Sequence, residues 1–170
     1  MMLSSLIKYN KFVILLLLKM YFLEENLMEV KIINRSKNEN PTYATEGASG
    51  FDLRANLDED LMIKPLERVA VPTGLFLEIP LGYEGQIRAR SGMSLKHGIT
   101  MANGVGTIDS DYRGEIKVLI VNLSDKEYVI KNNDRIAQMI ITKYERAEFK
   151  LVEELSDTTR DKGGFGHTGY

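Results

Sequence analysis

Short runs of apolar residues, several of them alternating with polar ones, follow one another along the chain from residue 29 onward. The runs are rich in Val, Ile and Tyr, and Gly, Pro, Asn and Asp separate them at short intervals. Many short strands at close spacing are typical of an all-β sandwich or barrel rather than of alternating helices and strands. We therefore expect a β domain over residues 29–155, with strands within 29–33, 61–64, 68–71, 74–79, 85–90, 115–122, 126–130 and 134–145.

One segment departs from the strand pattern. The stretch SGMSLKHG predicts a short helix, with Ser91 capping its N-terminus and Gly98 just past its end. Further along, Asn103-Gly104 is the strongest short signal for a hairpin turn.

The first 28 residues have a different composition from the rest. Their apolar run, Phe12–Leu18, is followed by Lys19 and falls short of the roughly 20 apolar residues of a membrane-spanning helix. No small-x-small cleavage pattern of a signal peptide follows it. We expect residues 1–28 to be a non-essential extension, with Met28 as the start of the functional chain, and we expect no stable membrane association.

Charge and composition limit the classes of partner. The chain has 170 residues and a net charge of −2, so no basic field favours a nucleic-acid polymer. It has no cysteine, which excludes disulfides and thiolate metal sites, and its two histidines, His97 and His167, are far apart. A catalytic metal would then be a hard cation held by carboxylates and substrate oxygens.

Two stretches combine charged side chains with turn or helix signals. Arg90 and Ser91 stand where a strand passes into the predicted helix. This junction is either a phosphate site or the start of a capped helix beside a solvated arginine. In NGVGTIDSDYRGEI, Asp109 and Asp111 would be neighbours on one face if the stretch is extended, whereas a polar turn is the alternative. The glycines of this stretch would let a ligand approach the backbone closely.

Two further features need a partner. Gln138 lies within an apolar strand and must hydrogen-bond either to another backbone or to a ligand. The C-terminal RDKGGFGHTGY places a phenylalanine between glycines, which suggests an arm that folds over an anion rather than a loose end. Phosphate recognition is common to all four features.

The order of these pieces resembles the trimeric deoxyuridine triphosphatase family. Its five motifs correspond here, in order, to ASGFDLRA, RARSGMSLKHG, NGVGTIDSDYRG, DRIAQMI and RDKGGFGHTG. The resemblance implies a distorted β-barrel or jelly-roll-like sandwich with one short helix, assembled as a homotrimer with sites at the subunit interfaces. It also implies Mg²⁺-assisted, in-line attack of water on the α-phosphate of dUTP, giving dUMP and pyrophosphate. The expected cellular role is to limit uracil in DNA and supply dUMP for dTTP synthesis, in the cytoplasm.

The resemblance also assigns roles to residues around the base, the sugar and the reacting phosphate. Asp109 matches the general base that activates the attacking water. Tyr112 matches the tyrosine packed under the deoxyribose, which leaves no space for a 2′-hydroxyl. Asn103 and the hairpin backbone around it, with Gly106, match the groups that read the uracil edge.

The remaining phosphate and metal roles follow in the same way. Arg90, Ser91 and Gly92 match phosphate contacts, and Gln138 matches a contact to phosphate or to a metal-bound water. Asp52 matches the aspartate that helps hold hydrated Mg²⁺.

The family's C-terminal arm corresponds to residues 156–170, and in the family it closes a site formed by the other two subunits. Phe165 would stack on uracil, Arg160 would reach the terminal phosphate, and Gly166 and Thr168 would wrap the phosphate chain. One departure is Asp161, which stands where the family commonly has glycine. If that position needs a positive φ, Asp tolerates it less well than Gly, and its charge lies near the expected γ-phosphate.

Three alternatives remain open from the sequence. A dCTP deaminase, monofunctional or bifunctional, shares the fold, although IDSDYRG and GGFG favour the triphosphatase. A non-catalytic trimer could bind dUTP or a protein partner as a sensor. A purely structural β-sandwich would give no reason for five ordered motifs.

Overall fold

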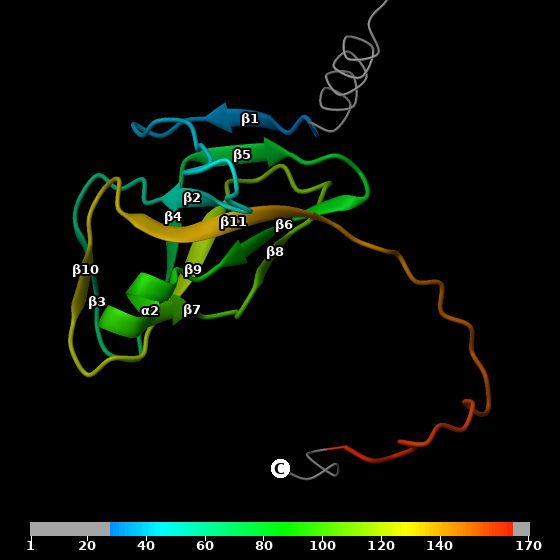
Figure 1. Ribbon diagram of the computed structural model, residues 1–170. Coiled ribbons are helices and arrows are strands. Elements are labelled where there is room, and N and C mark those ends of the chain that lie inside the picture. Colours follow the sequence, from blue (N-terminus) through cyan, green and yellow to red (C-terminus); the bar gives the residue numbers. More distant parts are fainter. Residues whose placement is uncertain (1–27, 165–170) are drawn as a thin grey trace, which may run out of the picture.

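The structure, a computed structural model, describes residues 28–164, and within them it forms strands and one short helix (Figure 1). This confirms the all-β fold expected from the sequence. The helix is α2 (Ser91–His97). The strands are β1 (Lys31–Asn34), β2 (Phe51–Arg54), β3 (Leu61–Ile63), β4 (Arg68–Pro72), β5 (Leu75–Glu78), β6 (Tyr83–Arg88), β7 (Ile99–Met101), β8 (Gly106–Ile108), β9 (Lys117–Asn122), β10 (Tyr128–Ile130) and β11 (Arg135–Lys143).

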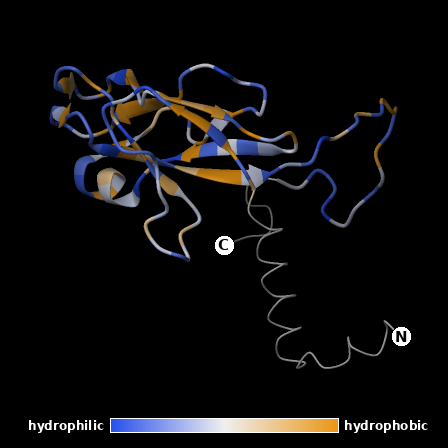
Figure 2. Cartoon of the chain, turned by 90° about the horizontal axis from the view of Figure 1, so that it is seen from above, coloured by the Kyte–Doolittle hydropathy of each residue, from blue (hydrophilic) through white to orange (hydrophobic). Residues whose placement is uncertain are grey.

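The strands pair antiparallel in small sheets. The largest has the order β2-β11-β6-β8, a second has the order β4-β9-β7, and β1-β5 and β10-β3 form two-stranded ribbons. Strands far apart in sequence are therefore neighbours, as in jelly-roll-like folds. Figure 2 shows that the strands hold most of the hydrophobic residues, while the loops around them are mainly hydrophilic.

The alternation of the sequence sets the core. In β9, Val118 and Ile120 are fully buried, while Lys117 and Leu119, which alternate with them, are exposed. Val71, Leu53 and Met139 contribute fully buried side chains from other strands. Because successive side chains of a strand point to opposite faces, one face of each sheet closes this core and the other remains available for a site.

All the strand-like runs of the sequence form strands, but the pattern missed β2, β7 and β8. These strands are three or four residues long and include polar residues, so they show no alternation long enough to detect. The predicted helix is confirmed, and Gly98 ends it in the left-handed region with φ 66°. The predicted N-cap was wrong: Arg90 occupies that position without a side-chain cap bond, and Ser91 is already helical.

The prediction of a hairpin at Asn103-Gly104 was also wrong. Gly104 has φ 70° and its N–H donates to the Met101 carbonyl, as expected of a tight turn. It does not make a hairpin, however, because β7 pairs with β9 whereas β8 pairs with β6. The turn passes the chain from one sheet to another and leaves a hollow beside it.

Beyond β11 the chain leaves the body of the domain. Residues 144–164 have no helix or strand, and Figure 1 shows this arm running away from the sheets. Phe149 is 95% exposed and Leu155 is 87% exposed. Among the residues described, no helix has the length and apolar character needed to cross a membrane.

Candidate functional site

A pocket opens beside β8, at one edge of the largest sheet. Four predicted site residues line it together: Asn103, Gly106, Asp109 and Tyr112. Its other lining residues include Ile87 from β6, Met101 from β7, Glu115 just before β9, and Lys117 and Leu119 within β9. The sequence analysis did not single out these last three residues, because they belong to an ordinary strand pattern.

The chain after β8 turns instead of staying extended. The Tyr112 N–H donates to the Asp109 carbonyl at 3.1 Å, and Arg113 Nη1 donates to the Ser110 carbonyl at 2.7 Å. Asp109 therefore lines the pocket without Asp111, and the two carboxylates are not paired on one strand face. Of the two interpretations of this stretch, the polar turn is the one observed.

The Tyr112 side chain folds back over this turn. Its hydroxyl donates to the Glu115 carbonyl at 3.1 Å. Glu115 Oε1 in turn accepts the Gly74 N–H at 2.9 Å, which ties the turn to the start of β5. The Tyr112 ring is thus anchored across the turn by its hydroxyl.

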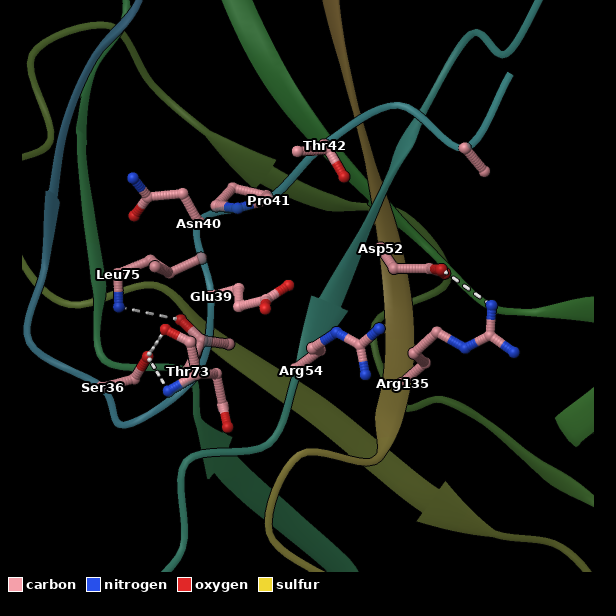
Figure 3. Close-up of a pocket in the computed structure, with 12 residues that line it drawn as sticks. Ser36, Glu39, Asn40, Pro41, Thr42, Asp52, Arg54, Thr73, Leu75 and Arg135 are labelled. Carbon is pink, nitrogen blue, oxygen red and sulfur yellow. Dashed lines mark hydrogen bonds and ion pairs between the residues drawn. The ribbon is translucent and has the colours of Figure 1, made fainter.

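A second polar cluster surrounds Asp52 on β2. Its Oδ1 lies 3.1 Å from Arg90 Nε, and its Oδ2 lies 3.2 Å from Arg135 Nη1. Arg90 also donates through Nη1 to the Arg135 carbonyl at 2.9 Å. Figure 3 shows Asp52 and Arg135 pointing toward each other from adjacent strands, with Arg54 nearby. Arg135 was missed in the sequence, where it is one arginine at the start of an apolar strand.

Gln138 joins this cluster through a backbone bond. Its Nε2 donates to the Ala89 carbonyl at 3.1 Å, which supports the segment just before Arg90. This bond is the backbone partner considered for Gln138, and its contact with a ligand stays a prediction. In the sheet, Gln138 lies opposite both Asp52 and Arg88, so β11 brings these three together.

Arg90 and Gly92 line a further pocket with Lys96, His97 and Tyr128, while Ser91 is exposed at the start of α2. The His97 and Tyr128 rings lie 5.0 Å apart. Burial raises the pKa of the Tyr128 phenol above its ordinary value. Arg90, Lys96 and Arg135 outnumber the one acidic lining residue, Asp134, which suits an anion.

The pocket that Asp109 lines and the arginine cluster, which consists of Arg90 and Arg135 around Asp52, lie apart within one chain. In the order β2-β11-β6-β8, three strand spacings of about 4.8 Å separate Asp52 from the end of β8, or about 14 Å. Ile108 pairs with Gly85 near the start of β6, whereas Arg90 follows its end, roughly 15–20 Å further along. Asp109 and the arginine cluster of the same chain therefore lie in separate parts of the sheet.

The described part of the arm contains a turn. The Asp161 N–H donates to the Thr158 carbonyl at 3.2 Å and to Thr158 Oγ1 at 3.0 Å. Arg160 Nε donates to the Gly163 carbonyl at 2.9 Å. Asp161 has φ 45°, the left-handed conformation considered for this position. The other predicted arm residues, Phe165, Gly166 and Thr168, lie outside the described residues, as does His167.

Within residues 28–164, no three His, Cys, Asp or Glu side chains form a group that could hold a metal ion. Near the arginines, Asp52 offers a half-buried carboxylate and Gln138 an amide. Such a donor set fits a hydrated Mg²⁺, which commonly keeps its waters and binds through one or two carboxylates and substrate phosphates. It does not fit a cation caged by protein ligands alone.

Known proteins that resemble this chain in sequence and known proteins that resemble it in fold belong to the same family. A dUTPase family model matches residues 36–169. Deoxyuridine 5'-triphosphate nucleotidohydrolase of Finegoldia magna is 62% identical over 84% of this chain and all of its own length. The Fusobacterium nucleatum enzyme of the same name is 55% identical over 84% of this chain and 97% of its own. Among solved structures, the Staphylococcus bacteriophage 80alpha dUTPase with dUPNHPP has a TM-score of 0.77 and 26% identity, covering 85% of this chain and all of that chain.

Proposed function

The chain belongs to the dUTPase family and is a dUTP diphosphatase, and from this premise we propose how its residues carry out the reaction. The observation that supports the proposal most directly is the pocket beside β8, where Asn103, Gly106, Asp109 and Tyr112 line one hollow. A base, a sugar and a reacting phosphate can be recognised from that one surface.

The pocket selects uracil and deoxyribose. Asn103 and the backbone near Gly106 pair with the acceptor and donor groups of uracil, whereas cytosine presents a donor where uracil has an acceptor. Each buried mismatch of this kind costs about 1–3 kcal/mol. The Tyr112 ring lies under the deoxyribose and leaves no space for a 2′-hydroxyl.

Asp109 is the general base. Its carboxylate accepts a proton from a water molecule, whose oxygen forms a bond to the α-phosphorus. The opposite bond, from the α-phosphorus to the bridging oxygen, breaks, and pyrophosphate leaves with that electron pair. A positioned base of this kind is typically worth about 10²- to 10⁴-fold in rate.

The arginine cluster receives the phosphates. Arg90, which is paired with Asp52 in the free protein, turns to a phosphate oxygen, while Arg135 stays with the Asp52 carboxylate. Ser91, Gly92 and Gln138 provide the other phosphate contacts. Asp52 would hold a hydrated Mg²⁺ through its waters, together with Gln138 if that side chain bonds a metal-bound water instead of a phosphate, and the ion would neutralise part of the triphosphate's roughly four negative charges.

The complete site is shared between subunits of a homotrimer. The separation of Asp109 from the arginine cluster within one chain supports an arrangement in which the cluster comes from a second copy. The arm of a third copy closes over the nucleotide, with Arg160 at the terminal phosphate, Phe165 on uracil, and Gly166 and Thr168 around the phosphates. The enzyme would supply dUMP and limit uracil in DNA, in the cytoplasm.

Pyrophosphate release tests this function directly. With Mg²⁺ present, we expect rapid release from dUTP and little from dCTP, dTTP or UTP. Release of ammonia from dCTP, measured alongside, would instead support the deaminase alternative. No pyrophosphate from any of the four and no ammonia from dCTP, with a protein shown to be folded, would favour a binding module without catalytic activity.

Asp161 is expected to set how easily the arm closes. Asp161→Asn keeps a residue that tolerates positive φ and removes the charge, whereas Asp161→Ala removes both. Alanine disfavours the left-handed conformation, whereas the short polar side chain of asparagine makes it tolerable. The KM for dUTP should therefore be about three- to tenfold higher in Asp161→Ala than in Asp161→Asn. Asp161→Gly should give a KM no higher than that of Asp161→Asn. Equal KM values in all three variants would contradict a conformational role.

A further inference from the structure

The Tyr112 ring lies directly against the backbone of Gly114. A Cβ atom on Gly114 would stand 2.5 Å from Tyr112 Cζ and 2.9 Å from Cε2, and it would also overlap the hydroxyl oxygen. Real Cβ atoms do not approach ring atoms so closely, so any side chain at residue 114 would displace the ring.

The backbone of Gly114 itself does not require glycine. Within residues 28–164 the glycines with positive φ are Gly74, Gly82, Gly98 and Gly104, and Gly114 is not among them. An alanine at residue 114 could therefore adopt the observed backbone without strain. The need for glycine at this position comes from the Tyr112 ring.

A shift of the ring away from Gly114 would cost it a specific contact. The ring hydroxyl is bonded to the Glu115 carbonyl at 3.1 Å, and the backbone N–H of Tyr112 is bonded to the Asp109 carbonyl. Glu115 is fixed in turn by the Gly74 N–H. Displacing the ring from Gly114 therefore breaks the hydroxyl bond and changes the wall of the pocket that Asp109 shares.

We propose that Gly114 is a positioning residue for sugar selectivity, because the absence of its side chain lets the Tyr112 ring lie where it supports deoxyribose and excludes ribose. The inference rests on the proposed role of Tyr112 in dUTP hydrolysis. It adds a requirement that the identity of Tyr112 alone does not give: the same tyrosine, displaced by one methyl group, would select the sugar poorly.

The test compares kcat/KM for dUTP and UTP in Gly114→Ala and in the matched control Gly47→Ala. Gly47 is exposed, has no neighbouring atom within 4 Å of an added Cβ, and lies outside the proposed site. We expect Gly114→Ala to lower the dUTP-to-UTP ratio by about tenfold or more and Gly47→Ala to leave it unchanged.

Tyr112→Ala supplies the second comparison. With the ring removed, the added methyl group at residue 114 has nothing to displace, so Gly114→Ala/Tyr112→Ala should match Tyr112→Ala alone. If Gly114→Ala does not fold, the double variant should recover folding for the same reason. An unchanged ratio in folded Gly114→Ala, additive losses in the double variant, or a folding defect that Tyr112→Ala does not repair would overturn the proposal. If the wild-type protein releases no pyrophosphate from dUTP, the proposed function itself fails, which is a separate outcome.

Discussion

Asp109→Asn is expected to bind dUTP about as well as the wild-type protein and to lose turnover by at least about a hundredfold. Asparagine has nearly the same shape as aspartate but cannot accept a proton from water. The backbone bond from the Tyr112 N–H to the residue 109 carbonyl is independent of the side chain, so the turn should persist. Asp109 is exposed and outside the core, so the substitution should not affect folding. Single-turnover pyrophosphate release and calorimetric binding of dUTP would separate the two effects.

Asp111→Asn is the matched control for this experiment. Asp111 is an exposed aspartate of the same turn but does not line the pocket, so its neutralisation changes the local charge equally. We expect its turnover to stay near that of the wild-type protein. Near-normal turnover in Asp109→Asn would remove Asp109 as the base. The other pocket carboxylate, Glu115, would then need testing, although its Oε1 is engaged by the Gly74 N–H.

Residues that are close in sequence were the most predictable part of the site. Asn103, Gly106, Asp109 and Tyr112 belong to one stretch, and the turn that holds them is local, so a motif carries most of the information. The conformation of that stretch was harder to predict, since an extended strand and a polar turn fit the same residues. The observed hydrogen bond from Tyr112 to Asp109 settled it in favour of the turn.

Contacts between distant residues could not be predicted. The pairing of Asp52 with Arg135 joins residues 83 positions apart and depends on the register of β2 against β11. A strand pattern gives the existence of β11 but not its neighbours, and the pattern missed β2 altogether. The closeness of Gly114 to the Tyr112 ring was hidden for another reason, because a glycine in a turn usually suggests backbone freedom.

Removal of residues 157–170 is expected to leave a folded protein that has lost most of its activity. Residues 157–162 are exposed, and the turn at Thr158 is held by bonds within the arm itself. The thermal unfolding transition should therefore be unchanged. Since the arm would supply Arg160 and Phe165 and would exclude water, its loss should reduce kcat/KM for dUTP by about 10²-fold or more. Full activity in the shortened protein would contradict a lid.

Mixing two inactive variants would show whose arm closes which site. The arm leaves the body of its own domain, so in a trimer it would cover a pocket whose Asp109 belongs to another chain (Figure 1). Unfolding and refolding the shortened protein together with Asp109→Asn should therefore restore activity at about a quarter of the sites, those that combine an intact base with an intact arm. The same two proteins refolded separately and then mixed should stay inactive until subunits exchange. No recovery in properly assembled mixtures would mean that each arm serves the base of its own chain, because then no mixed assembly contains a complete site.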